Sequence, residues 1–444
     1  MLRVSVFAGM IVFALFALSG CYGRSHYATM GDVQRAVQTG DYDHAEQLVK
    51  EKEELQSTRN DLLYALELGV LHHLNGKYAE SNSWLETAAA RMEELDRISI
   101  SGTTSDWIFS EKFHPYRGED FERVFVHYYM TLNYLMLGQL QEALVECRRV
   151  NTLLQYLNSR YEHKNVYKTD AFILYLSGLI YDALGEINDA FIDYRRAYQT
   201  YLGDYRQYYA TPPPSQLLAQ LLRTTAALGF SDIFETYRAD FSTQQWPTQD
   251  EYRDSARLVV IWNKGLTPYK TERSFRWNSG GHDWLKEDDP GCYLKFSFAE
   301  FIPRPETFSR ANISINGKVQ SLELAEDVGR IAIKNLEDRR LRTVMQAVSR
   351  NTIKCVGQHE WLDDTAWVWR WLYAGAVELT EGVDLRHWFL LPAEVHIAQL
   401  LVEPGLTDVE FSFLDAAGRC AKQVLYKDVR LEHGKTTFLI HRTF

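Results

Sequence analysis

Cys21 is the residue whose position in the sequence most clearly indicates chemistry. It follows a positively charged start, an apolar run from Val4 to Leu18, and the small pair Ser19-Gly20. This is the layout of a cleavable signal peptide, and a cysteine directly after small residues is the pattern of a bacterial lipobox. The apolar run is shorter than the roughly 20 residues that span a bilayer. We therefore expect residues 1–20 to be a lipoprotein signal peptide and Cys21 to be the lipidated first residue of the mature chain.

The residue after this cysteine predicts which membrane holds the protein. An Asp at that position favours retention in the inner membrane of bacteria, and this sequence has Tyr22 instead. Two or more acyl chains anchor a protein firmly, whereas one chain alone binds weakly. We expect an anchor in the outer membrane on its periplasmic face.

The histidines and the other cysteines do not have the spacing of a metal site. His72 and His73 are adjacent on a predicted helix, so their side chains point about 100° apart. The remaining cysteines are far apart and form no C-x-x-C pair, which disfavours structural zinc. We expect buried thiols, with one disulfide among the last three as the alternative, and we predict no metal or cofactor. The four are Cys147, Cys292, Cys355 and Cys420.

Two polar clusters are candidates for catalysis, and both have a structural interpretation. Asp384, Arg386 and His387 precede Trp388 and an apolar segment. We expect Asp384 and Arg386 to pair and hold a turn, with Trp388 buried; a general-base role for His387 is the alternative. The acidic cluster at residues 119–122 suits a helix start, where negative side chains favour the dipole. No motif of a known catalytic class is present, and we predict no enzymatic activity.

A helical repeat in the first half of the mature chain positions most of these residues. Its copies have the small and aromatic pattern of a tetratricopeptide (TPR) repeat, in which two antiparallel helices approach closely at Gly and Ala positions. The best copy runs from Asp170 to Tyr198, and a second surrounds Gly69. The array is irregular, with an insertion at residues 96–120 that contains Trp107, Phe109, Phe113 and Tyr116. The predicted turn glycines are Gly40, Gly76, Gly138 and Gly185.

The hydrophobic period changes near residue 255, which marks a domain boundary. Alternating apolar segments predict strands, and one helix is predicted at residues 332–354. The fold class is α+β multidomain: an all-α TPR-like solenoid at 21–240, a linker at 241–255, and a β-rich α+β or sandwich-like domain at 256–444. The predicted strands include Arg257–Trp262, Tyr293–Phe298, Asn312–Gly317, Val409–Phe413 and Thr436–Ile440.

The concave face of the repeats is the predicted partner-binding groove. The first helix of each repeat directs aromatic and aliphatic side chains into it, so the groove suits an apolar or aromatic peptide. The alternative is a groove filled by the protein itself, for example by residues 107–116. The predicted groove residues are Phe125, Tyr128, Tyr129, Leu132, Phe172, Tyr175, Leu176 and Leu179.

Cationic side chains define two further surfaces. The helix at 332–354 is predicted to present a face for anionic ligands, because arginine binds phosphate and carboxylate bidentately; its members are Arg339, Arg340, Arg342, Arg350 and Lys354. Two arginine pairs occupy equivalent places in two repeats, Arg148-Arg149 and Arg195-Arg196. They form either a basic stripe for an acidic partner or a solvated surface without a ligand. The net charge of −11 argues against nucleic acid as a partner.

The chain resembles an uncharacterised family of bacterial TPR-containing envelope lipoproteins. The resemblance is carried by Tyr116–Arg123 with Tyr128–Arg149, by Arg257–Lys270, by Arg339–Lys354 and by Asp384–Pro392. It implies an envelope location and protein partners, small lipoproteins among them, but no biochemical activity. We expect a TPR scaffold in the assembly or regulation of a cell-envelope machine. The alternative is a module binding peptidoglycan or surface polysaccharide through Trp361, Trp367, Trp369 and Trp371.

Overall fold

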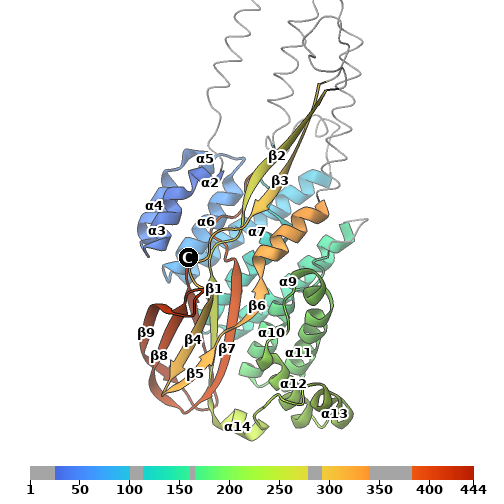
Figure 1. Ribbon diagram of the computed structural model, residues 1–444, viewed down its shortest axis with the longest axis vertical. Helices are drawn as coiled ribbons and strands as arrows, with labels where there is room; N and C mark the ends of the chain where they lie inside the picture. The colour runs from blue at the N-terminus through green and yellow to red at the C-terminus, as the bar shows by residue number, and fades with distance from the viewer. Residues whose placement is uncertain (1–25, 101–113, 161–165, 279–292, 340–382) are drawn as a thin grey trace, which may run out of the picture.

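The structure is a computed structural model that describes residues 26–100, 114–160, 166–278, 293–339 and 383–444 (Figure 1). The predicted signal peptide and Cys21 lie outside these ranges. Within them, no helix combines the length and the apolar character needed to cross a membrane. The helices are α2 (His26–Thr29), α3 (Gly31–Gln38), α4 (Tyr42–Glu51), α5 (Glu53–Gln56), α6 (Asp61–Leu74), α7 (Tyr78–Ile100), α8 (Asp120–Met136), α9 (Leu140–Arg160), α10 (Ala171–Leu184), α11 (Ile187–Thr200), α12 (Ser215–Ala227), α13 (Ser231–Asp240) and α14 (Gln249–Asp254).

The helices pair in the manner of a TPR solenoid, as the sequence predicts. The pairs are α3–α4, α6–α7, α8–α9, α10–α11 and α12–α13, each antiparallel and joined by a short turn. A glycine with φ between +71° and +83° lies in each turn, at Gly40, Gly76, Gly138, Gly185 and Gly229. A left-handed residue after the last helical turn is favourable only for glycine, which has no Cβ.

Glycines inside the first helix of a repeat allow that helix to contact the second helix closely. A Cβ added at Gly178 would lie 2.5 Å from ring atoms of Tyr194 on α11, and one at Gly69 would lie 2.7 Å from Leu85 on α7. Tyr194 cannot yield easily, because it is fully buried and its hydroxyl donates to Asp182 at 2.7 Å.

Gly178→Ala should therefore lower the free energy of unfolding by about 1–3 kcal/mol, as overpacking of a core does. Urea denaturation of the purified protein measures the change. Gly31→Ala is the matched control, since a Cβ there meets only Arg35 at 3.9 Å, and alanine is favoured over glycine in a helix. Equal stability of the two variants would contradict this account of the helix contact.

The second half of the chain forms two packed sheets and a hairpin. One sheet has the order β10-β1-β7-β6, the other has the order β5-β4-β8-β9, and β2 pairs with β3. The predicted helix at residues 332–354 directly follows β6. It begins at residue 328 rather than 332 and is described to residue 339. The strands are β1 (Ala256–Lys264), β2 (Tyr269–Asn278), β3 (Tyr293–Ile302), β4 (Arg310–Ile315), β5 (Lys318–Ser321), β6 (Glu323–Asp327), β7 (Glu394–Val402), β8 (Gly405–Leu414), β9 (Cys420–Leu431) and β10 (Thr436–Arg442).

Strand β1 shows how the two halves of the chain are joined, because every one of its residues is buried. Leu258, Val260 and Trp262 contribute to a core between the two sheets. Val259 and Ile261 point to the opposite face and join the core of the helical repeats. Alternate residues of a strand face opposite sides of its sheet, so this sheet lies between the helices and the second sheet (Figure 1).

The helical region extends beyond α11, because a π-helical segment (Tyr201–Tyr209) continues it. One boundary differs from the prediction. Helix α7 extends through the predicted start of the insertion at residue 96. Trp107, Phe109 and Phe113 lie outside the described residues, and Tyr116 is buried.

Candidate functional site

The predicted concave groove is filled by the second half of the chain. Its eight residues on α8 and α10 are at most 2% exposed. They share one core with the segment Trp388–Leu391 and with Val259, Ile261 and Phe438 of the central sheet. The alternative of a self-filled groove is therefore the one observed, although the filling residues are not those of the insertion. Direct contact of Phe125, Tyr128, Tyr129, Leu132, Phe172, Tyr175, Leu176 and Leu179 with a partner does not fit this structure.

Aromatic side chains bridge the two halves at this contact. The ring of Tyr129 packs on Trp388 at 5.9 Å between centroids. Tyr128 donates to Asn263 Oδ1 of β1 at 2.7 Å, and Tyr201 donates to the carbonyl of Ala325 at 2.8 Å. Buried tyrosines contribute apolar area and a polar tip that needs a partner. The sheet supplies those partners for Tyr128 and Tyr201.

Two buried glutamates of the repeats bind the backbone of the segment that fills the groove. Glu122 of α8 accepts from Trp388 N at 2.7 Å. Glu67 of α6 accepts from Phe389 N at 2.6 Å and from Leu390 N at 3.3 Å. A carboxylate accepts several N–H groups at once, so both glutamates satisfy backbone donors that burial would otherwise leave unpaired.

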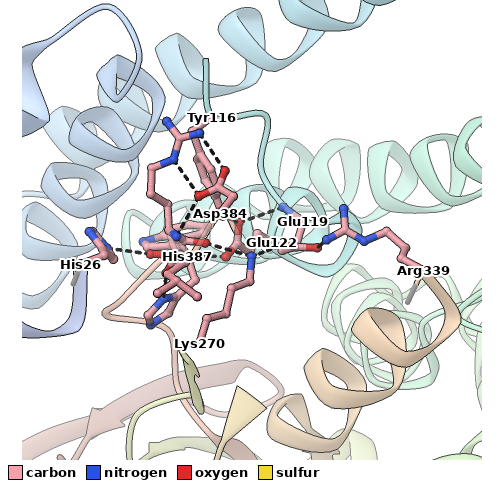
Figure 2. A network of polar contacts seen from close by, with 11 residues as sticks. His26, Tyr116, Glu119, Glu122, Lys270, Arg339, Asp384 and His387 are labelled. Carbon is pink, nitrogen blue, oxygen red and sulfur yellow. Dashed lines mark hydrogen bonds and ion pairs between the residues drawn. The ribbon is translucent and has the colours of Figure 1, made fainter. Parts of the chain in front are cut away.

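A network of charged groups surrounds this contact (Figure 2). Glu119 precedes the first residue of α8, which confirms the predicted helix start. Its carboxylate lies between Lys270 and Arg339. Burial would raise the pKa of Glu119, but the two cations outweigh burial and hold it at about 2. We define these contacts, together with those of Glu67, Glu122 and residues 384–391, as the inter-domain joint.

Arg339 is the one described member of the predicted arginine face, and it is paired within the protein rather than turned outward. Its guanidinium pairs with Glu119, and its side chain is 32% exposed. Leu336 is packed against the core, and residues three apart lie on one face of a helix, so Arg339 turns toward the core as well. Arg340, Arg342, Arg350 and Lys354 lie outside the described residues.

The Asp384–Arg386 pair holds a turn, as predicted, with an ion pair of 2.7 Å. Arg386 also donates to the carbonyls of Arg59 and His114 at 3.0 and 2.9 Å. Trp388 is fully buried, and His387 is 1% exposed, with its backbone oxygen 3.0 Å from His26 Nε2. Burial lowers the pKa of His387 well below its usual value. A histidine so enclosed is poorly placed to act as a general base on a substrate.

The four segments on which the resemblance rests all contribute residues to the inter-domain joint. These residues are Tyr116–Arg123, Lys270, Arg339 and Asp384–Leu391. Sequence reasoning assigned roles to some of these residues but missed that they lie together. It also missed Glu67. The available signal was a single carboxylate in the middle of the otherwise apolar first helix of a repeat.

Burial raises the pKa of Glu67 to about 8, against an ordinary value of 4.5. Between those two values the folded protein binds more protons than the unfolded chain does. The stability associated with Glu67 is therefore complete below pH 4.5 and decreases as the pH rises toward 8. Glu67→Gln removes this titration and keeps an acceptor oxygen. The variant should gain stability relative to the wild type between pH 5 and pH 8, as measured by urea denaturation at both values.

Glu251→Gln is the control for this experiment. Hydrogen bonds from Thr248 lower the pKa of Glu251 below its ordinary value of 4.5, so its contribution is complete above pH 4.5 and decreases only at lower pH. Its difference from the wild type should be the same at pH 5 and pH 8. A pH-independent difference for Glu67→Gln would show that Glu67 is charged in the folded protein.

The described histidines and cysteines have separate environments. His72 Nε2 lies 3.6 Å from Glu46, whereas His73 Nδ1 lies 2.6 Å from Asn133 Oδ1. Cys147 is buried, as predicted, and burial raises its pKa to about 12. The prediction of a buried thiol is wrong for Cys420, which is exposed on the edge strand β9; both cysteines are free thiols. In the described part of the chain, no group of three or more His, Cys, Asp or Glu could hold a metal ion. Cys292 and Cys355 lie outside it, as do the four predicted glycan-binding tryptophans.

The opposite side of the repeats has an open groove, which we call the outer groove. Its walls are the second helices α7 and α9, and its floor is α8, where Met130 and His127 line it. It encloses about 840 Å³. Val145 and Tyr156 on the α9 wall are 42% and 40% exposed. Arg148 and Arg149 of the predicted basic stripe line the same wall. In the described ranges this groove is therefore an open surface between two repeats, whereas the concave face is buried.

No family model and no curated protein matches this sequence. Among solved structures, MamA from Desulfovibrio magneticus RS-1 is 15% identical, with 48% of this chain and 90% of that chain covered and a TM-score of 0.30. A Podosopora anserina putative kinesin light chain with TPR-like repeats is 18% identical over 48% of this chain and 92% of its own, with a TM-score of 0.31. A thermophilic TPR protein from Thermus thermophilus is 16% identical over 49% and 90%, with a TM-score of 0.25. These similarities cover about half of this chain, and their identities and TM-scores are too low to define a family.

Proposed function

We propose that this protein is a lipid-anchored scaffold that binds partner proteins in the bacterial envelope and supports the assembly or regulation of an envelope machine. The observation that carries the proposal is the division between its two repeat surfaces. The concave face is buried against the chain's own sheet, which makes one continuous body, while the outer groove stays open. Such a body holds a partner at a fixed position relative to its anchor.

The proposed anchor, Cys21, lies only a few residues before a helix that contacts the inter-domain joint. Helix α2 begins at His26, which is buried and contacts the backbone of His387. The five residue-to-residue steps from Cys21 to His26 reach at most about 18 Å when the chain is fully extended. A lipid on Cys21 would hold the body near the membrane surface, within reach of small lipoproteins in the same leaflet. We place the protein on the periplasmic face of the outer membrane.

The anchor is tested by labelling cells with a palmitate analogue and separating their membranes. The wild type should be labelled and recovered with the outer membrane, and Cys21→Ser should be unlabelled. Labelling of both proteins, or of neither, would count against the proposed lipidation.

Partner binding is tested by photo-crosslinking in living cells with a probe at Val145 in the outer groove. The matched control is Ile192, which has the equivalent position on α11 and is 44% exposed, against 42% for Val145. We expect a discrete partner adduct from Val145 and none from Ile192. If probes at Val145, Tyr156 and other exposed positions capture no discrete partner, the scaffold proposal fails. The glycan alternative predicts instead that tryptophan fluorescence shifts with peptidoglycan fragments.

A further inference from the structure

The two walls of the outer groove carry opposite charges. Glu86, Ala90 and Glu93 recur at intervals of three and four along α7, so they form one exposed face. On α9, Arg148 and Arg149 lie on the face that Val145 and Tyr156 continue. One wall is therefore acidic and the other basic.

The floor between these walls combines Met130 with two polar side chains of α8, Arg123 and His127, and each of these two is paired within the protein, with Asp96 and with Glu146. Met130 of α8 is buried beneath the groove, and Ala89 and Leu153 line it from the two walls. Arg97 at the far end of α7 is the exception to the acidic wall, and Asp96 beside it pairs with Arg123 of the floor at 2.7 Å. Around Met130, Ala89 and Leu153 the groove presents an acidic edge, an apolar centre and a basic edge.

The arginines of the basic wall keep donors for a ligand. Arg149 pairs with Glu146 at 2.9 Å, and its side chain is 54% exposed. Arg148 donates to the hydroxyl of Tyr181 at 2.8 Å through one nitrogen. A guanidinium has five N–H donors, so each arginine can also bind a carboxylate at the groove.

The shape of the walls favours a helix as the occupant. The backbone N–H and C=O groups of α7 and α9 are used within those helices, so the walls offer no edge to which an extended peptide could add as a strand. A helix satisfies its own backbone groups, and its ridge of side chains can pack between two helices. The small side chains of Ala89 and Ala90 leave room for close approach.

We propose that the outer groove binds an amphipathic α-helix of the partner protein. This helix has an apolar ridge, basic side chains along the edge facing α7, and acidic side chains along the edge facing α9. The α7 wall runs from Glu86 to Arg97, which is about 16 Å at 1.5 Å per residue, so the bound helix spans about three turns. The proposal rests on the scaffold function, because it names the class of partner that the scaffold holds.

Two synthetic helical peptides of about 14 residues test this recognition by fluorescence anisotropy on the full mature protein. Both have the same apolar ridge and the same composition. The segregated peptide has Lys along one edge and Glu along the other, and the mixed peptide alternates them on both edges. The segregated peptide should bind about tenfold more tightly, which corresponds to about 1.4 kcal/mol. Equal affinities, or no binding of the segregated peptide, would overturn the proposal.

Charge reversal on the protein identifies the site. Arg148→Glu with Arg149→Glu makes both walls acidic and should weaken the segregated peptide by about tenfold or more. Adding Glu86→Arg and Glu93→Arg restores opposite walls, and the peptide can then bind in the reverse direction, so its affinity should return. The control is Arg195→Glu with Arg196→Glu at the equivalent place on α11, which should change nothing. If the control weakens binding as much, or the fourfold variant fails to restore it, the helix does not bind in this groove.

These results are separable from those on the scaffold function. If the peptides do not discriminate while in-cell crosslinking from another surface captures a discrete partner, the scaffold stands and the groove proposal fails. If no exposed position captures a partner, the scaffold fails whatever the peptides do.

Discussion

Replacing Trp388 with alanine is expected to lower the free energy of unfolding by about 3–5 kcal/mol, the range found when a large buried aromatic side chain is removed. Trp388 is fully buried, and its ring packs on Tyr129 of α8. The hydrogen bond from the backbone N–H of residue 388 to Glu122 remains in the variant. The loss would therefore come from the cavity left between the two halves of the chain.

Urea denaturation followed by circular dichroism measures this loss, and Trp246→Ala is the matched control. Trp246 is only partly buried and packs on Phe234 at the edge of the repeats, so its removal should cost less. The wild type should unfold in one transition, because the repeats and the sheet share a core. Two separate transitions, or a loss below about 1 kcal/mol for Trp388→Ala, would contradict a shared core.

The second large effect is expected at Arg223 of α12, whose side chain has no exposed surface. Its guanidinium pairs with Asp182 of α10 and lies 3.7 Å from the ring centroid of Tyr252. Arg223→Leu leaves the carboxylate of Asp182 buried without a cation. Breaking a buried ion pair in this way costs about 3–5 kcal/mol.

A double variant separates the pair from its surroundings. Asp182→Leu with Arg223→Leu removes both charges, so its loss of stability should be smaller than the sum of the two single losses. Arg196→Leu is the control, because Arg196 pairs with Asp193 at 3.2 Å with its side chain 46% exposed; its loss should not exceed about 1 kcal/mol. Additive losses in the double variant would mean that Arg223 and Asp182 do not interact in the folded protein.

The helical repeats could be predicted from the sequence because their signals are local. Gly178 is required by its contact with Tyr194, which lies on the next helix of the same repeat. The turn glycines adopt the positive φ that their spacing implies. The first strand was predictable for the same reason. Its continuous apolar run corresponds to a strand buried on both faces.

The occupant of the concave face could not be predicted, because its main polar partners carry no sequence signature. Glu67 binds the backbone N–H groups of Phe389 and Leu390, and every residue except proline has such a group. These contacts join segments that lie 322 and 323 positions apart in the sequence. The aromatic pattern of α8 and α10 indicated an apolar ligand correctly, but only the fold shows that the ligand is the chain itself.

Arg339 illustrates a different kind of error. Its charge suggested an outward position, yet its helical spacing from Leu336 places both on one face, and Glu119 supplies the partner that allows burial. A charged residue on the inner face of a helix is evidence for an ion pair across the interface. In this chain, that pair joins the helix at residues 328–339 to the start of α8.

Hydrogen exchange of the full mature protein at peptide resolution tests most directly whether the concave face is permanently filled. The amides of Trp388, Phe389 and Leu390 donate to the buried carboxyl groups of Glu122 and Glu67, so they should exchange only when the whole protein unfolds. Peptides covering residues 384–391 should then be as strongly protected as those of α8 and α10. Rapid exchange in 384–391 while α8 and α10 remain protected would show that the segment leaves the groove, and that the concave face is open to partners.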